Sequence, residues 1–136
     1  METADEILAI EDDEAQATML RRVLESAGFR VHTAGTGQDG LKYATDHPVG
    51  LAILDLRLPD ITGFEVCQAL RQRYDSWAVP VVMLTGMDRP IDQLRGYRSG
   101  ADVYLTKPYN VAELLQIVGS LLTPQEGPDA SRSCYW

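Results

Sequence analysis

The clearest structural signal in the chain is the stretch Leu51-Ala52-Ile53-Leu54-Asp55-Leu56-Arg57-Leu58-Pro59-Asp60. Its apolar run has the length of a buried strand, and Leu58-Pro59-Asp60 predicts a turn. Such runs are typical of strands in parallel sheets, which helices cover on both faces. Asp55 directly follows the strand, at the position where open α/β sheets hold their ligands. Taken alone, Asp55 is better explained as a solvated loop aspartate.

Apolar runs and amphipathic segments alternate along the rest of the chain. Strands are expected at Ile7–Ile10, Phe29–Ala34, Leu51–Leu54, Val79–Leu84 and Asp102–Leu105. Helices are expected from Glu14 to Ala27, around Leu41 and Ala44, after Gly63, around Ile91, Leu94 and Tyr97, and from Val111 to Leu122. This alternation predicts an α/β fold, a doubly wound parallel sheet with helices on both faces.

Composition and charge limit the function. The formal net charge of −8 argues against direct nucleic-acid binding and against an anionic membrane surface. No apolar stretch approaches the length of a membrane span, and the acidic start is no signal peptide. Cys67 and Cys134 show neither disulfide nor zinc spacing, which favours a reducing, cytoplasmic setting. We interpret the isolated His32 and His47 as structural or solvent-facing.

Polar residues follow four of the expected strands: Glu11, Asp12 and Asp13, then Asp55, Thr85 and Lys107. If strands one and three are neighbours, the acids converge on one crevice beside a hydroxyl and an ammonium group. Carboxylates gathered in this way raise one another's pKa unless a cation lies among them. Oxygen ligands favour a hard ion such as Mg²⁺.

Several motifs, in this order, resemble those of response-regulator receiver domains, the phosphoacceptor half of two-component signalling pairs. They are Ile10-Glu11-Asp12-Asp13, Leu54-Asp55, Leu58-Pro59-Asp60 with Gly63, Leu84-Thr85-Gly86, and Tyr104 followed by Lys107-Pro108. The resemblance runs from about Ile7 to Leu122 and implies a flavodoxin-like receiver fold with strand order 2-1-3-4-5. We therefore expect a receiver domain over residues 1–122 and a flexible tail or linker remainder over 123–136.

The resemblance also implies roles for single residues. Asp55 would accept a phosphoryl group from a histidine of a sensor kinase or histidine phosphotransfer protein. Lys107 would pair with Asp55 and then with a phosphoryl oxygen, and the Lys107–Pro108 peptide is expected to be cis. Thr85 would donate its hydroxyl to the phosphoryl group, and Tyr104 would rotate inward on phosphorylation. Mg²⁺ would be held by the side chains of Asp12 and Asp55, the backbone carbonyl of Arg57, and Glu11 through a water.

Phosphorylation would then change the surface around the fourth and fifth strands and helices, where a downstream effector binds. Glu113 is the only charge of the last expected helix, and Val103 stands where winged-helix regulators often carry an acid. We therefore expect a hydrophobic partner surface or a different homodimer in place of the usual charged one. We also hypothesise that Arg57 and Met87, which flank Asp55 and Thr85, restrict attacking water and set the phosphoryl lifetime.

Other functions fit less well. A receiver-like binding module that works without phosphorylation would lack the acceptor, the acid pair or the lysine, and none is missing here. A haloacid-dehalogenase-like Mg²⁺ phosphatase needs a second acid where Arg57 stands. A flavin-mononucleotide binder needs an anion-binding loop where Glu11, Asp12 and Asp13 would repel the phosphate. The sequence thus favours a signalling switch over an enzyme.

Overall fold

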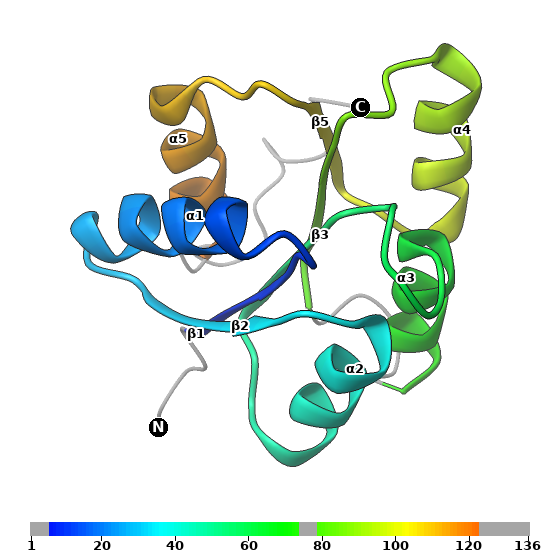
Figure 1. The fold of residues 1–136 in the computed structure, drawn as a ribbon, viewed down its shortest axis with the longest axis horizontal. Coiled ribbons are helices and arrows are strands. Elements are labelled where there is room, and N and C mark those ends of the chain that lie inside the picture. The colour runs from blue at the N-terminus through cyan, green and yellow to red at the C-terminus, as the bar shows by residue number, and fades with distance from the viewer. Residues whose placement is uncertain (1–5, 74–78, 123–136) are drawn as a thin grey trace, which may run out of the picture.

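The computed structural model describes residues 6–73 and 79–122. The strands β1 (Glu6–Ile10), β2 (Arg30–Ala34), β3 (Leu51–Leu54), β4 (Val81–Thr85) and β5 (Val103–Thr106) form one parallel sheet in the order β2-β1-β3-β4-β5 (Figure 1). The predicted fold class and strand order are confirmed. Residues 123–136, expected to be a tail, lie outside the described residues, as does Cys134.

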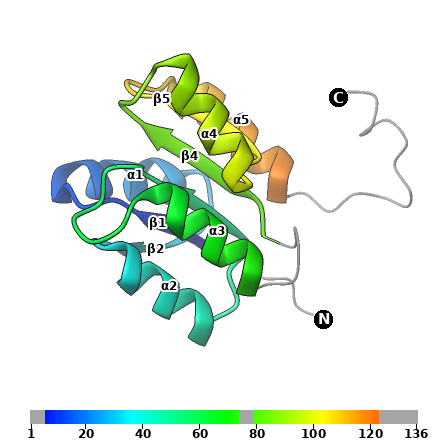
Figure 2. The ribbon, with the colours of Figure 1, turned by 90° about the vertical axis from the view of Figure 1, so that its right-hand side faces the viewer.

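Helices cover both faces of the sheet. They are α1 (Glu14–Ser26), α2 (Gly37–Asp46), α3 (Gly63–Arg73), α4 (Pro90–Ser99) and α5 (Val111–Leu122). α1 and α5 lie on one face and the other helices on the opposite face, where Figure 2 shows α3 between α2 and α4. None of the helices in the described ranges has the length and apolar character needed to cross a membrane.

The strand residues alternate between two hydrophobic cores. In β1, Leu8 and Ile10 pack in the core beneath α2 and α3, whereas Ile7 and Ala9 pack against α1 and α5. All of these side chains are at most 1% exposed. Burial on both faces explains why the strands have nearly continuous apolar sequences and not alternating ones.

The ends of the helices follow local sequence signals. Asp13 caps α1 by accepting a hydrogen bond from the Gln16 N–H at 3.0 Å, and Thr36 caps α2 in the same way from Asp39. Gly100 ends α4 with a left-handed φ of 113°, which glycine adopts without steric cost.

The fourth helix is present as predicted, but its apolar residues do not face the sheet. Ile91, Leu94 and Tyr97 are 52%, 49% and 48% exposed. The buried residues of α4 are Asp92, Gly96 and Ser99. Gly96 faces inward, and a larger residue would not fit there because its Cβ would lie 2.7 Å from the ring of Tyr104 in β5. The apolar spacing therefore indicated the helix and not its buried face.

His32 and His47 are not isolated in the fold. Both imidazole rings stack on the ring of Tyr43, with centroid distances of 3.7 and 4.0 Å. The Tyr43 hydroxyl donates a hydrogen bond to Glu6 at the start of β1. This contact ties α2 to the amino end of β1, which agrees with a structural interpretation of the two histidines.

Two glycine-to-alanine substitutions should have opposite effects on stability. A Cβ at Gly63 would meet the backbone carbonyl oxygen of Asp55 and lie 2.9 Å from the Cα of Leu56, and backbone atoms cannot move aside cheaply. Gly63→Ala should therefore destabilise the fold by about 2 kcal/mol, as overpacking does. At Gly119 in α5, a Cβ meets nothing within 4 Å.

Gly119→Ala should stabilise the protein by about 0.5–1 kcal/mol, because alanine is the better helix former. Urea denaturation measures both changes as shifts of the midpoint at an unchanged slope. Equal effects of the two substitutions would contradict the close approach at Gly63.

Candidate functional site

The site lies at the carboxyl ends of β1, β3, β4 and β5. Ile10 pairs with Leu54 in the register of β1 and β3, so the next residues, Glu11 and Asp55, emerge side by side. The Asp55 N–H donates to the Ile10 carbonyl at 3.1 Å, which fixes this placement. The Lys107 N–H donates to the Thr85 carbonyl at 2.8 Å and brings the end of β5 to that of β4.

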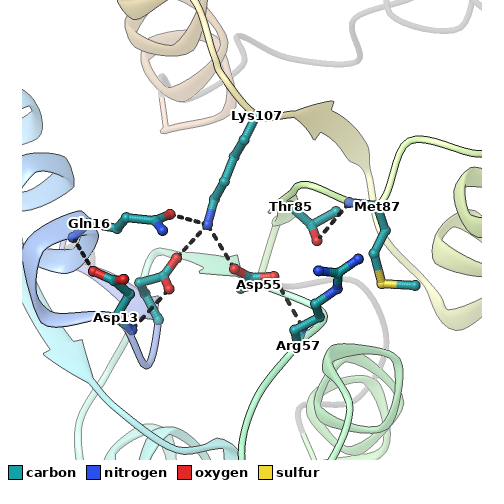
Figure 3. A network of polar contacts seen from close by, with 8 residues as sticks. Asp13, Gln16, Asp55, Arg57, Thr85, Met87 and Lys107 are labelled. Atoms are coloured by element: carbon teal, nitrogen blue, oxygen red, sulfur yellow. Dashed lines mark hydrogen bonds and ion pairs between the residues drawn. The ribbon is translucent and has the colours of Figure 1, made fainter.

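The ammonium group of Lys107 is the centre of the site (Figure 3). It donates hydrogen bonds to Asp55 Oδ2 at 2.8 Å and to Glu11 Oε1 at 2.7 Å. Gln16 Oε1, from the first turn of α1, is a third acceptor. A lysine ammonium has three N–H donors, so each of them has a protein acceptor here.

Burial and pairing set the charges of these groups. Burial disfavours the charged form of Asp55, but hydrogen bonds from Lys107 and from the Arg57 N–H hold the pKa of this carboxyl below its usual range. Burial raises the pKa of Glu11, and the bond to Lys107 offsets only part of this effect. For Lys107, burial is outweighed by its bonds to Asp55 and Glu11, which raise its pKa. Asp55 is therefore a buried, ionised carboxylate beside a fixed positive charge.

The remaining acids of the first loop have different environments. Asp13 caps α1, and its own N–H donates to Glu11 Oε2 at 3.1 Å, which orients the Glu11 carboxylate. Asp12 and the side chain of Arg57 are exposed. The Arg57 N–H donates to Asp55 Oδ1 at 3.1 Å and leaves its backbone carbonyl for other contacts.

The donors at this edge suit a hard, hydrated cation. Glu11, Asp12, Asp55 and the Arg57 carbonyl offer only oxygen atoms. Within residues 6–73 and 79–122, no three acidic, histidine or cysteine side chains gather closely enough to hold a metal ion by themselves. Mg²⁺ keeps several of its waters and usually takes one or two carboxylates, so this donor set fits Mg²⁺.

Thr85 and Tyr104 are both bonded to the backbone of Met87. Thr85 is fully buried, and its Oγ1 accepts a hydrogen bond from the Met87 N–H at 3.3 Å. The Tyr104 hydroxyl donates to the Met87 carbonyl at 2.6 Å. The Tyr104 ring is 8% exposed and lies beneath α4 at Gly96. In this structure the aromatic ring thus already points inward.

Comparison with known proteins identifies the family. The model of the response regulator receiver domain matches residues 7–119. The chain is 43% identical over 116 residues to the DNA-binding dual master transcriptional regulator RpaA of Synechocystis, an alignment that covers 85% of this chain and 48% of that protein. This chain belongs to the response regulator receiver domain family.

Further relatives agree with this assignment. The receiver domain is 38% identical over 120 residues to the alkaline phosphatase synthesis transcriptional regulatory protein PhoP of Bacillus subtilis, covering 88% of this chain and 49% of PhoP. It therefore spans about half the length of these curated relatives. The crystal structure of a CheY-like receiver domain protein from Methanospirillum hungatei matches with a TM-score of 0.82 at 28% identity, covering 88% of this chain and 94% of that one.

The structure brings together most residues that the receiver motifs indicated, and it adds one residue, Gln16, and an unpredicted contact of Asp60. Glu11, Asp55 and Lys107 are in direct contact, and the Lys107–Pro108 peptide is cis as predicted. Gln16 was not predicted to reach the site. Asp60 accepts hydrogen bonds from the N–H groups of Gly37 and Gln38, both at 2.8 Å, and so joins the loop after Asp55 to the start of α2.

The contact between Tyr104 and Met87 predicts a stability difference that depends on pH. Tyr104→Phe removes one buried hydrogen bond and should cost about 1 kcal/mol at neutral pH. Burial, followed by the nearby carboxylates, raises the pKa of Tyr104 from 10.0 to about 12. Between these values the unfolded chain loses a proton that the folded chain keeps, so the contribution of Tyr104 falls as pH rises.

The stability advantage of the wild type over Tyr104→Phe should therefore shrink as the pH rises from 10.0 to about 12. Chemical denaturation across this range measures it. Tyr97→Phe, at an exposed position in α4, is the control and should change stability by less than about 0.5 kcal/mol. A constant difference between wild type and Tyr104→Phe would contradict the burial of this hydroxyl.

Proposed function

We propose that Asp55 accepts a phosphoryl group from a phosphohistidine of a sensor histidine kinase or a histidine phosphotransfer protein. An Asp55 oxygen attacks the phosphorus, and the bond between phosphorus and the imidazole nitrogen breaks. The imidazole leaves with the electron pair, and Asp55 becomes an acyl phosphate. The observation that carries the proposal is the ionised, buried Asp55 carboxylate at the end of β3, paired with Lys107 at 2.8 Å.

The neighbouring residues have complementary roles in this proposal. Lys107 already touches the acceptor carboxylate and is placed to hold a phosphoryl oxygen once Asp55 has reacted. Thr85, at the end of the adjacent strand, offers a hydroxyl to another phosphoryl oxygen. Phosphoryl transfer depends mainly on positioning and on charge stabilisation, and these side chains supply both.

Mg²⁺ completes the proposed site. The side chains of Asp12 and Asp55 and the backbone carbonyl of Arg57 would hold it, with Glu11 acting through a water. When bound, Mg²⁺ supplies positive charge that offsets the charge of the phosphoryl group. The oxygen-only donor set and the two buried carboxylates support this assignment.

The output of the proposed switch is a change in the surface of α4, β5 and α5. Thr85 would move toward the phosphoryl group and take the Met87 backbone with it, which alters the contact of Met87 with Tyr104. The exposed apolar side chains of α4 support a hydrophobic partner, either an effector or a second copy of the chain: Ile91, Leu94 and Tyr97.

We infer that residues 1–122 form the signalling unit and that residues 123–136 are a tail or a link. The two relatives are named as transcriptional regulators and are about twice as long as the matched region, which supports an effector domain as the partner. The net charge of −8 argues against direct nucleic-acid binding, so we propose that the chain exerts its output in another way. The proposed role is a cytoplasmic signalling switch and not an enzyme of independent turnover.

Intact-mass measurement tests the proposal. After incubation with acetyl phosphate and Mg²⁺, the wild type should gain the mass of one phosphoryl group. Asp55→Asn should gain none, and the wild type should gain none when the divalent ion is chelated. Equal gain in wild type and Asp55→Asn would place the acceptor elsewhere. Absence of gain in the wild type would leave either a receiver that is phosphorylated only by its own kinase or a binding module that works without phosphorylation.

The lifetime of the acyl phosphate tests the residues that flank the site. Arg57 is exposed, and Met87 is half-buried against the core beside Thr85. If both side chains restrict the approach of water, Arg57→Asn and Met87→Glu should shorten the lifetime severalfold, since the first shortens a bulky side chain and the second replaces an apolar group with a carboxylate that binds water. Loss of the phosphoryl mass over time after removal of donor measures this. Unchanged lifetimes in both variants would reject the hypothesis.

A further inference from the structure

Among the residues that the structure describes, Gln16 is the one acceptor of the Lys107 ammonium group that the receiver motifs do not account for. It lies in the first turn of α1, where its N–H is held by the capping carboxylate of Asp13 at 3.0 Å. Its side chain extends from this fixed backbone to the ammonium group of Lys107 (Figure 3). The residues are 91 positions apart in the sequence, so the contact is a product of the fold.

The chemistry of the third acceptor matters because the other two are charged. Glu11 and Asp55 already place two carboxylates around one ammonium group. A carboxamide oxygen satisfies the remaining N–H without adding a negative charge where a phosphoryl dianion must arrive. An apolar side chain would leave that N–H to water, and the ammonium group would be less firmly placed.

We propose that Gln16 is a positioning residue for phosphoryl transfer, which holds the ammonium group of Lys107 over Asp55 through its carboxamide oxygen. The inference rests on the proposed function and assigns it a further residue. During transfer, the Asp55 carboxylate gives up its charge as its oxygen bonds to phosphorus. Lys107 then exchanges its bond to Asp55 for one to a phosphoryl oxygen, while Gln16 and Glu11 keep the ammonium group in place.

Two substitutions of Gln16 test separately whether a hydrogen-bond acceptor is needed at this position and whether it must be uncharged. Gln16→Met keeps the length of the side chain and removes the acceptor; Gln16→Glu keeps an acceptor and adds a charge. Thr18→Met is the matched control, since Thr18 is exposed on the same helix and is not an acceptor of the Lys107 ammonium group.

Acetyl phosphate is the donor of choice because it is small. Gln16 also lines an apolar pocket of about 280 Å³ with Met19, Leu84 and Tyr109, which a protein donor can touch. In its transfer the bond from phosphorus to the acyl oxygen breaks, and acetate leaves with the electron pair.

We expect Gln16→Met to accept the phosphoryl group roughly tenfold more slowly than wild type, the effect of weakening one hydrogen bond to a charged group. Gln16→Glu should also be slow, and its deficit should shrink with added salt because it arises from charge repulsion. Thr18→Met should match the wild type, and all variants should unfold at similar temperatures. Wild-type rates in Gln16→Met, or in Gln16→Glu at low salt, would overturn the inference.

A second readout does not depend on phosphorylation. The sequence contains two lysines, Lys42 and Lys107. In protein whose lysines carry ¹³C at Cε, the NMR spectrum therefore shows one signal for each of them. Without donor, Gln16→Met should shift the Lys107 signal and leave that of the exposed Lys42 in place, whereas Thr18→Met should shift neither. An unmoved Lys107 signal would overturn the inference. A wild type that gains no phosphoryl group from acetyl phosphate or from a phosphohistidine donor would contradict the proposed function, and this result is distinct from wild-type kinetics in Gln16→Met.

Discussion

The ammonium group of Lys107 lies between two carboxylates that are 7% and 8% exposed, those of Glu11 and Asp55. Parallel pairing of β1 with β3 forces these acids together, and without a cation they would repel each other in a poorly solvated site. Buried ion pairs contribute little net stability, whereas removing one partner is costly. A role in the reaction of Asp55 therefore explains this arrangement better than a contribution to the stability of the fold. It keeps one carboxylate ionised, desolvated and accessible at the end of a strand.

The same edge of the sheet connects the acceptor to a distant surface. Met87 is bonded on one side to Thr85 and on the other to Tyr104. The Tyr104 ring occupies the space that a side chain at Gly96 would fill, and α4 consequently turns its apolar residues to solvent. In the proposed switch, a movement of Thr85 would act on α4 through one residue of the intervening loop. The close packing around Tyr104 would make such a movement a change between discrete arrangements.

The sequence predicted the elements well because a parallel sheet buried on both faces produces apolar runs, and its helices produce regular spacing. The convergence of Glu11, Asp55 and Lys107 also followed, once the receiver motifs supplied the strand order. The buried face of α4 did not follow from the apolar spacing, because glycine faces inward and Leu94 outward. The contacts of Gln16 and Asp60 join residues far apart in the chain, and no local pattern marks them.

Locating the phosphoryl group within the chain is the most direct test of this account. After incubation with acetyl phosphate and Mg²⁺, borohydride reduces an aspartyl phosphate to homoserine, and tandem mass spectrometry of the peptides identifies the altered residue. We expect homoserine at position 55 and no reduced residue at Asp12, Asp13 or Glu11, where reduction of a glutamyl phosphate would give 5-hydroxynorvaline. A reduced residue at one of the other acids, or phosphate retained on Thr85, would contradict the central role of the carboxylate that Lys107 holds.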